Sequence, residues 1–271
     1  SSQNQGHCHP RIVAALKKQA DKLTLVSRYV SLVIYHLPLL FSRDLFLFTW
    51  DRSFLFFSST VRGIIFAEGN FWGRTLSAST KRPKRSRRCF SPILILHFVT
   101  QKELQDPNTA AFFVEPIQGE AGVRVPDEGY LRRVRELCTK YNVLWIADEV
   151  QTGLGRTGKL LAVEHEGVKP DMVILGKALS GGIVPVSAVL TSRSIMDVIT
   201  PGTHGSTYGG NPLACAVASE VLLDEKLIEN AANMGKIFGE ELRKIPKSLI
   251  TTVRGRGLLY AIDINDSKLR Y

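Results

Sequence analysis

The chain has 271 residues, of which 44% are hydrophobic and 22% are charged, so it can bury a substantial core and form one large or two small domains. Its formal net charge of +10 does not indicate a nucleic-acid-binding fold, because six positive charges lie in one run at 81–88 and the rest of the chain carries only +4. The four cysteines are far apart and form no CxxC pair, which argues against a disulfide framework and fits a reducing compartment.

The first part of the chain predicts one helix, followed by a stretch without a regular pattern. Residues 10–23 place apolar side chains on one face, and Pro10 suits the first turn of a helix. Residues 29–60 are rich in apolar and aromatic side chains, but they show neither a helical period nor alternation. A membrane span there is disfavoured, because Pro38 and four charged residues interrupt a run that must extend over about 20 residues.

From residue 101 onward the pattern is regular. Short apolar segments alternate with amphipathic ones, and this order predicts an α/β fold around a mostly parallel sheet. The expected strands are residues 110–115, 143–148, 171–176, 185–190 and 258–264, and the expected helices are residues 127–142 and 211–245.

Four segments carry side chains suited to catalysis or ligand binding, although each also has an ordinary structural explanation. Asp148 and Lys177 each follow a buried strand, at the edge of a parallel sheet where ligands bind. A strand-end aspartate also serves ordinary turns, whereas a partly buried lysine can form a Schiff base. The glycine-rich segment 204–212 leads into a helix and suits a phosphate or an ordinary turn, and the aromatic pair within 69–75 suits a flat ring or simple packing.

Together these segments supply what pyridoxal 5'-phosphate (PLP) requires: a lysine, a carboxylate for the ring nitrogen, a phosphate cradle and a stacking aromatic ring. The adjacent His7, Cys8 and His9 do not predict a metal site, because three neighbouring residues cannot readily converge on one ion. No metal is therefore expected.

Six segments resemble the class-III, fold-type-I aminotransferases, and the resemblance covers residues 3–28, 62–79 and 101–264. They are NQGHCHPRIVAAL, FAEGNFWGRTLSA, FFVEPIQGEAGV, LWIADEVQTGLGRTG, LGKALSGG and HGSTYGGNPLA. The resemblance implies a PLP-transferase-like large domain with a mostly parallel sheet, and a PLP-dependent transaminase.

The resemblance also implies roles for individual residues. Lys177 would form the Schiff base and Asp148 would pair with the pyridine nitrogen, and these two are the expected catalytic residues. The other expected cofactor contacts are Gln151 at the ring oxygen, Phe71 on the ring face, and Ser206 with Thr207 at the phosphate of the neighbouring subunit's cofactor. The expected substrate contacts are Trp72, Arg74 and Glu120, the last as a carboxylate that pairs with an arginine when the amine donor binds.

The segment Asn70–Arg74 is most similar to family members that act on ornithine. This implies transfer of the δ-amino group of ornithine to 2-oxoglutarate, giving glutamate semialdehyde and glutamate. Members that act on acetylornithine or 4-aminobutyrate are the alternatives, as is a catalytically inactive fragment. The family resemblance further implies a homodimer or higher homo-oligomer in the mitochondrial matrix, or otherwise in the cytoplasm, without nucleic-acid or membrane partners.

The sequence departs from the family in two ways. Nothing in residues 29–60 resembles the family's loop for the cofactor phosphate, and the chain stops at Tyr271, early in the C-terminal small domain and before the arginine that pairs with Glu120. We therefore expect incomplete N- and C-terminal parts and atypical, non-native inserts. The expected division is an N-terminal segment (1–28), an insert (29–61), a PLP-binding large domain (62–245) that contains a second insert (80–100), and the start of the small domain (246–271).

Overall fold

The computed structural model describes residues 4–25, 63–71, 101–200, 203–222 and 226–265. Both expected inserts, and the candidate membrane span within residues 29–60, lie outside these ranges. Within them no helix combines the length and the apolar character needed to cross a membrane.

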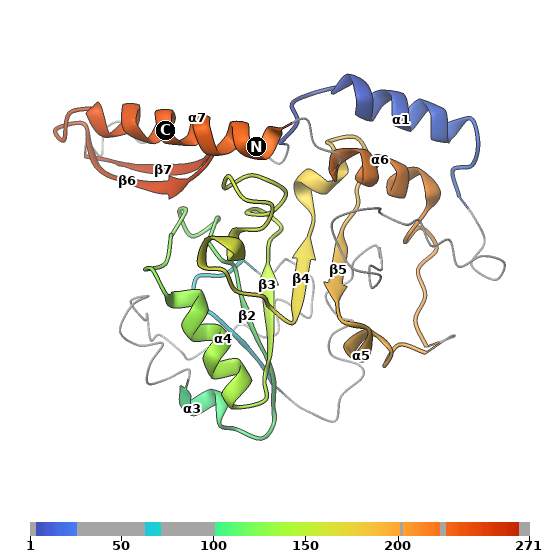
Figure 1. The fold of residues 1–271 in the computed structure, drawn as a ribbon, viewed down its shortest axis with the longest axis horizontal. Coiled ribbons are helices and arrows are strands. Elements are labelled where there is room, and N and C mark those ends of the chain that lie inside the picture. Colours follow the sequence, from blue (N-terminus) through green and yellow to red (C-terminus); the bar gives the residue numbers. More distant parts are fainter. Residues whose placement is uncertain (1–3, 26–62, 72–100, 201–202, 223–225, 266–271) are drawn as a thin grey trace.

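One five-stranded sheet forms the centre of the fold, with its strands in chain order (Figure 1). The strands are β1 (Gly63–Phe66), β2 (Thr109–Val114), β3 (Leu144–Asp148), β4 (Met172–Leu175) and β5 (Ala188–Thr191). The first four are parallel and β5 is antiparallel to β4, so the expectation of a mostly parallel sheet is confirmed.

Alternate residues of the strands point to opposite faces of the sheet, which gives two apolar clusters. On one face Phe112, Trp145 and Val173 pack in the main core with α4 (Tyr130–Lys140). On the other face Phe113, Ile146 and Ile174 form a second cluster. Because both faces are buried, the strands read in the sequence as continuous apolar runs.

Shorter elements connect the strands and cover their ends. They are α3 (Gln101–Leu104), α5 (Arg193–Met196) and the 3₁₀ helices η3 (Ala162–Glu166) and η4 (Lys177–Ser180). The helix expected at 127–142 is confirmed but begins at Tyr130, because Gly129 has a left-handed backbone (φ +84°). The strand expected at 185–190 lies at Ala188–Thr191, where it forms the edge of the sheet.

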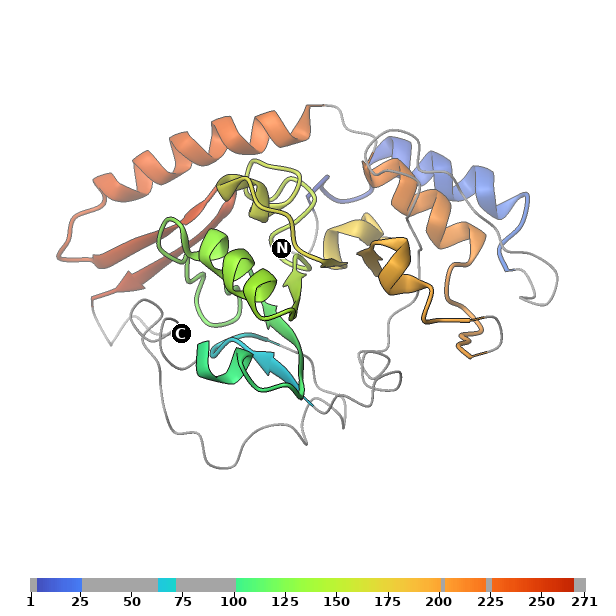
Figure 2. The same ribbon diagram turned by 60° about the horizontal axis from the view of Figure 1, so that its bottom comes forward.

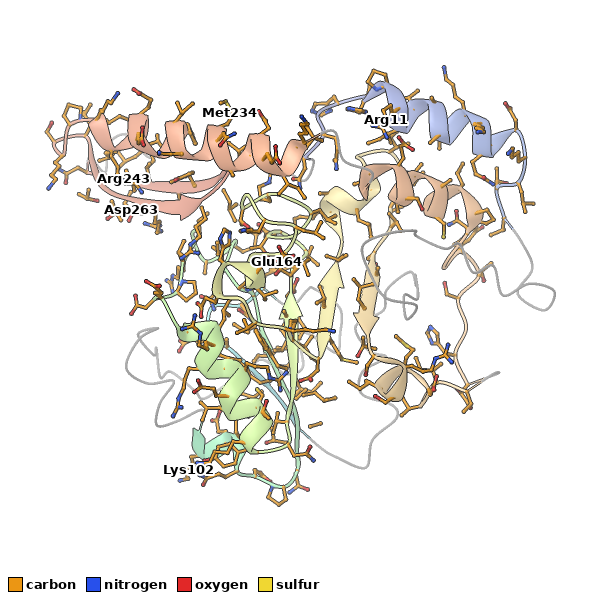
Figure 3. All side chains as sticks on the ribbon, in the orientation of Figure 1. Arg11, Lys102, Glu164, Met234, Arg243 and Asp263 are labelled. Carbon is orange, nitrogen blue, oxygen red and sulfur yellow. The ribbon has the colours of Figure 1, made fainter. Side chains whose placement is uncertain are left out.

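Two helices far apart in the sequence pack together beside the sheet. Helix α1 (Pro10–Ala20) lies against α6 (Pro212–Leu222), as both views show (Figures 1 and 2). Ile12 of α1 is buried against Val217 and Val221 of α6. Arg11, labelled in Figure 3, donates to Glu220 at 2.7 Å. The N-terminal helix is thereby fixed to an element that follows it by about 200 residues.

The C-terminal part is a helix on a hairpin. Helix α7 (Leu227–Lys244) lies along the antiparallel pair β6 (Ile250–Arg256) and β7 (Leu259–Ile264) (Figure 2). The helix and the hairpin are in close contact at Gly235 of α7, where a Cβ would overlap the backbone of Gly257. Gly257 itself has a positive φ of +55°. Helix α7 ends at Lys244, beside the expected domain boundary at 245/246, and the division into domains remains a prediction.

Candidate active site

The expected catalytic residues follow two neighbouring strands at the same edge of the sheet. Asp148 is the last residue of β3 and pairs in register with Ile174 of β4. Lys177 begins η4, two residues after β4 ends at Leu175. Because β3 and β4 are parallel, both residues lie at the carboxyl edge of the sheet, where open α/β folds bind ligands.

Asp148 is a buried carboxylate, with only 4% of its surface exposed. Its Oδ1 accepts a hydrogen bond of 3.0 Å from the N–H of Val150, so the turn after β3 orients it. A buried carboxylate of this kind suits a cationic partner, because an opposite charge offsets the cost of its desolvation.

Lys177 has an exposed side chain on a constrained backbone. Its φ of +40° lies in the left-handed region that residues other than glycine rarely adopt. The Ser180 hydroxyl donates to the Lys177 carbonyl at 2.8 Å, which closes the turn of η4. Such strained positions occur preferentially at functional sites, where the surrounding structure fixes one side-chain direction.

Gln151 and Glu120 are brought together from different segments. Gln151 Nε2 donates to Glu120 Oε1 at 2.8 Å. Gly119 leaves room for this contact, because a Cβ at that position would overlap the Gln151 amide and displace the end of that side chain. The structure thus places one expected cofactor contact next to one expected substrate contact.

The loop before Phe71 is fixed by a hydrogen-bond network. The Phe71 N–H donates to Glu115 Oε1 at 2.6 Å, and Gly119 N–H donates to Glu115 Oε2 at 3.0 Å. Asn70 Oδ1 accepts from the Glu115 N–H at 3.2 Å and from Gln118 Nε2 at 3.0 Å. The buried Glu115 therefore joins the segment that carries Phe71 to the segment that carries Glu120.

The expected phosphate segment precedes α6. Ser206 Oγ accepts from the Gly209 N–H at 2.9 Å, and the neighbouring Thr207 is exposed. Asn211 Oδ1 accepts from the Ala214 N–H at 2.8 Å and caps the start of α6. The two remaining expected substrate contacts, Trp72 and Arg74, lie outside the described residues.

Glu149, next to Asp148, is a buried carboxylate that our sequence interpretation did not single out. It is 1% exposed, accepts from the Val163 N–H at 3.0 Å, and receives a very short hydrogen bond from the Thr152 hydroxyl. Burial raises the pKa of Glu149 to about 7, and the adjacent Asp148 charge acts in the same direction. The signal in the sequence was a pair of adjacent carboxylates after a buried strand, of which only the first was interpreted.

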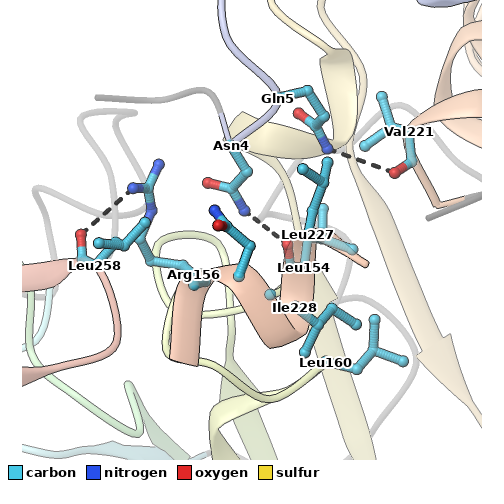
Figure 4. A pocket seen from close by; sticks show the side chains of 12 residues that line it. Asn4, Gln5, Leu154, Arg156, Leu160, Val221, Leu227, Ile228 and Leu258 are labelled. Atoms are coloured by element: carbon cyan, nitrogen blue, oxygen red, sulfur yellow. Dashed lines mark hydrogen bonds between the residues drawn. The ribbon is translucent and has the colours of Figure 1, made fainter. Parts of the chain in front are cut away.

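A small cavity of about 60 Å³ lies away from these residues (Figure 4). It is lined by the N-terminal residues Asn4 and Gln5, by the 154–160 loop and by the start of α7. Asn4 Nδ2 closes one side by donating to the Leu154 carbonyl at 2.7 Å. None of the expected site residues that the structure describes lines it, so we do not assign this cavity to the candidate site.

The residues at the sheet edge fit PLP in their chemistry. A buried carboxylate at the end of β3 suits a protonated ring nitrogen, and a lysine after β4 suits a covalent link. The side chains that surround them are already positioned by hydrogen bonds. Among the described residues no group of three or more His, Cys, Asp or Glu side chains could hold a metal ion.

Comparison with known proteins agrees with this chemistry. A family model described as aminotransferase class-III matches residues 74–270. The chain belongs to the class-III aminotransferase family, which confirms the expected PLP-dependent enzyme class.

Individual relatives show which members of this family the chain is similar to. The mitochondrial ornithine aminotransferase of Drosophila melanogaster is 52% identical, and the match covers 98% of this chain and 69% of the relative. A crystal structure of the Toxoplasma gondii ornithine aminotransferase, with partial PLP occupancy at its active site, has a TM-score of 0.82 at 41% identity and covers 99% of this chain and 71% of that one. The acetylornithine aminotransferase of Elizabethkingia anophelis has a TM-score of 0.80 at 45% identity, over 100% of this chain and 74% of that one.

Proposed function

We propose that this chain transfers the δ-amino group of ornithine to 2-oxoglutarate with PLP as its cofactor, giving glutamate semialdehyde and glutamate. The observation that carries the proposal is the placement of Asp148 and Lys177 after two adjacent parallel strands, in a chain about half identical to ornithine aminotransferases. The expected similarity to ornithine-acting family members is confirmed by these relatives.

Each residue at the sheet edge has a defined task in this reaction. Bound PLP supplies a conjugated ring that stabilises the charge left on a substrate carbon after deprotonation. Asp148 keeps the ring nitrogen protonated, because a buried carboxylate favours a cationic partner. Lys177 Nζ holds the cofactor between turnovers and accepts the proton that leaves the δ-carbon of ornithine.

Neighbouring residues orient the cofactor and the substrates. Their proposed roles are Gln151 at the ring oxygen, Phe71 on the ring face, Ser206 and Thr207 at the phosphate of a neighbouring subunit's cofactor, and Trp72, Arg74 and Glu120 at the substrate. The hydrogen bond between Gln151 and Glu120 supports the placement of cofactor and substrate contacts side by side.

Assembly and location follow from the same proposal. A site that draws Ser206 and Thr207 from a second subunit requires at least a homodimer. The mitochondrial location of the insect and rat relatives supports the mitochondrial matrix for this chain.

Two alternatives to this function are each supported by a particular finding. The 45% identity to an acetylornithine aminotransferase supports a different amine donor. An inactive fragment is supported by the alignment with the Drosophila relative, which runs over 302 positions, more than the 271 residues of this chain. That relative therefore has residues without a counterpart here.

The test is an absorption titration of the purified chain with PLP, alongside Lys177→Ala. We expect a visible band from the covalently bound cofactor that K177A lacks and that ornithine bleaches. We also expect transamination of ornithine to fall at least ~10³-fold in K177A, because the lysine is both the attachment point and the base.

Three other outcomes would redirect the proposal. Bleaching by acetylornithine or 4-aminobutyrate but not by ornithine would assign another amine donor. No band in either protein would identify the chain as an inactive fragment. An identical band in K177A would show that Lys177 is not the attachment point.

A further inference from the structure

The turn that carries Glu120 is joined to the C-terminal hairpin through one guanidinium group. Arg254 of β6 donates from Nε to the Gly122 carbonyl at 2.6 Å. Its two terminal nitrogens donate to the carboxylate of Asp263 on β7, which Figure 3 labels. The carboxylate fixes the plane of the guanidinium, so that Nε points at the turn.

The 118–124 turn is closed by backbone hydrogen bonds, and Gly122 and Val123 within it have positive φ angles. Gln118 and Arg124 exchange two backbone hydrogen bonds of 3.1 and 2.9 Å, and the Gly122 and Val123 amides both donate to the Gly119 carbonyl. Gly122 has a φ of +102° and Val123 a φ of +51°. A left-handed valine is unfavourable, so the turn needs contacts from outside to remain in this form.

Arginine is suited to this position in a way that lysine is not. One planar group must bind a carboxylate through two nitrogens and still present a third donor to a carbonyl at the side, and an ammonium group cannot hold this geometry. A Cβ on Gly122 would lie 3.2 Å from Arg254 Nη2, so the guanidinium is packed directly against the turn.

The contact with Arg254 also affects the position of Glu120. Glu120 lies two residues before Gly122, whose carbonyl accepts the hydrogen bond from Arg254. Glu120 accepts from Gln151, and Gly119 lets Gln151 approach. Movement of the turn would therefore separate the Glu120 carboxylate from the Gln151 amide.

We propose that Arg254 is a positioning residue that, oriented by Asp263, holds the 118–124 turn so that Glu120 stays in contact with Gln151, coupling the C-terminal hairpin to the substrate site. The inference rests on the proposed function for its effect on substrates. The contact between hairpin and turn is tested on the chain itself.

The experiment is amide hydrogen exchange on the full chain, comparing the wild type with R254A, R254K and D263N. We expect exchange at 118–124 to increase ~10-fold in R254A and by less in R254K and D263N, while the strands β2–β4 are unchanged. The matched control is R243A, which removes the same charge from an exposed position on α7 (Figure 3), and it should leave the turn unchanged.

Steady-state kinetics supply the second measurement. We expect R254A to raise KM for both substrates ~10-fold with kcat within ~3-fold, because cofactor attachment is intact and only substrate positioning is lost. Unchanged exchange at 118–124 in R254A, or an equal increase in R243A, would overturn the proposed contact. Increased exchange with unaltered KM would overturn its effect on substrates.

The two proposals fail in different ways. If R254A does not fold, R254K and D263N still report whether exchange at 118–124 depends on the guanidinium and its carboxylate. A wild-type chain without transaminase activity counts against the proposed function alone, because exchange is measured independently of turnover.

Discussion

The sheet and the C-terminal hairpin are both β structures, but their side chains are packed in different ways. In the sheet, Trp145 and Ile146 of β3 are fully buried, and both faces are covered. On the helix above the hairpin, Ile237 is 51% exposed and Phe238 is 47% exposed, and of the hairpin strands only Ile250 is buried. The residues proposed to carry the chemistry therefore lie on the fully packed region, whereas the hairpin is attached by backbone contacts and by the guanidinium groups of Arg156 and Arg254.

The largest effect should come from removing a side chain from the sheet. Ile146→Ala leaves a cavity in a fully packed site, and we expect it to lower the free energy of unfolding by about 2–5 kcal/mol. Urea unfolding measures this loss. The matched control Ile237→Ala, on the exposed face of α7, should cost less than about 1 kcal/mol. Equal losses at both positions would contradict the distinction between the regions.

A smaller effect is expected where α7 meets the hairpin. Gly235→Ala places a Cβ against the Gly257 backbone, and we expect a loss of about 2–3 kcal/mol, mostly as local opening of β6 and β7. Hydrogen exchange at β6–β7 and at β2–β4 measures this separately for the two regions. Gly239→Ala in the same helix meets the hydroxyl end of the Tyr260 side chain, which can rotate, so it should cost less. Parallel increases at all strands would show one cooperative unit.

The smallest effect is a dependence on pH at Glu149. Burial raises its pKa from 4.5 to about 7, so between these values the unfolded chain has released a proton that the folded chain retains. Stability from this group is therefore full below pH 4.5 and is lost as pH rises to about 7. Glu149→Gln removes the titration, and we expect it to be more stable than the wild type by about 1–2 kcal/mol above pH 7 but not at pH 5. Urea midpoints at several pH values check this, and a difference that does not vary with pH would refute it.

Much of the sheet could be predicted from the sequence because its strands are buried on both faces. The runs that contain β2, β3 and β4 are apolar, short and bounded by polar residues. Both their apolar pattern and their length therefore indicate buried strands. Strand β6 was missed because ITTVRGR mixes polar side chains with a glycine and buries only Ile250. Its pairing depends on β7 and on contact with α7, which no local pattern reports.

The same holds for the candidate site: residues beside an apolar run could be interpreted from the sequence, whereas contacts between distant segments could not. Asp148 and Lys177 could be proposed as site residues because each lies at or just after the end of an apolar run. The contact of Gln151 with Glu120 and the proposed role of Arg254 could not, because they join segments about 30 and 130 residues apart. Glu115 and Glu149 were not singled out as positioning groups, since a carboxylate beside a strand end gives no indication of which amides it will accept from.

The order of strands in the sheet has a consequence for how the chain is made. Among the described strands, each from β2 to β5 pairs with the one synthesised just before it, so the sheet can grow along one edge as the chain leaves the ribosome. Helix α1 is in the opposite situation. It is synthesised almost 200 residues before its partner α6. Ile12 therefore lacks its α6 contacts while the residues between the two helices are synthesised, and a nascent chain would present this apolar face to chaperones until α6 arrives.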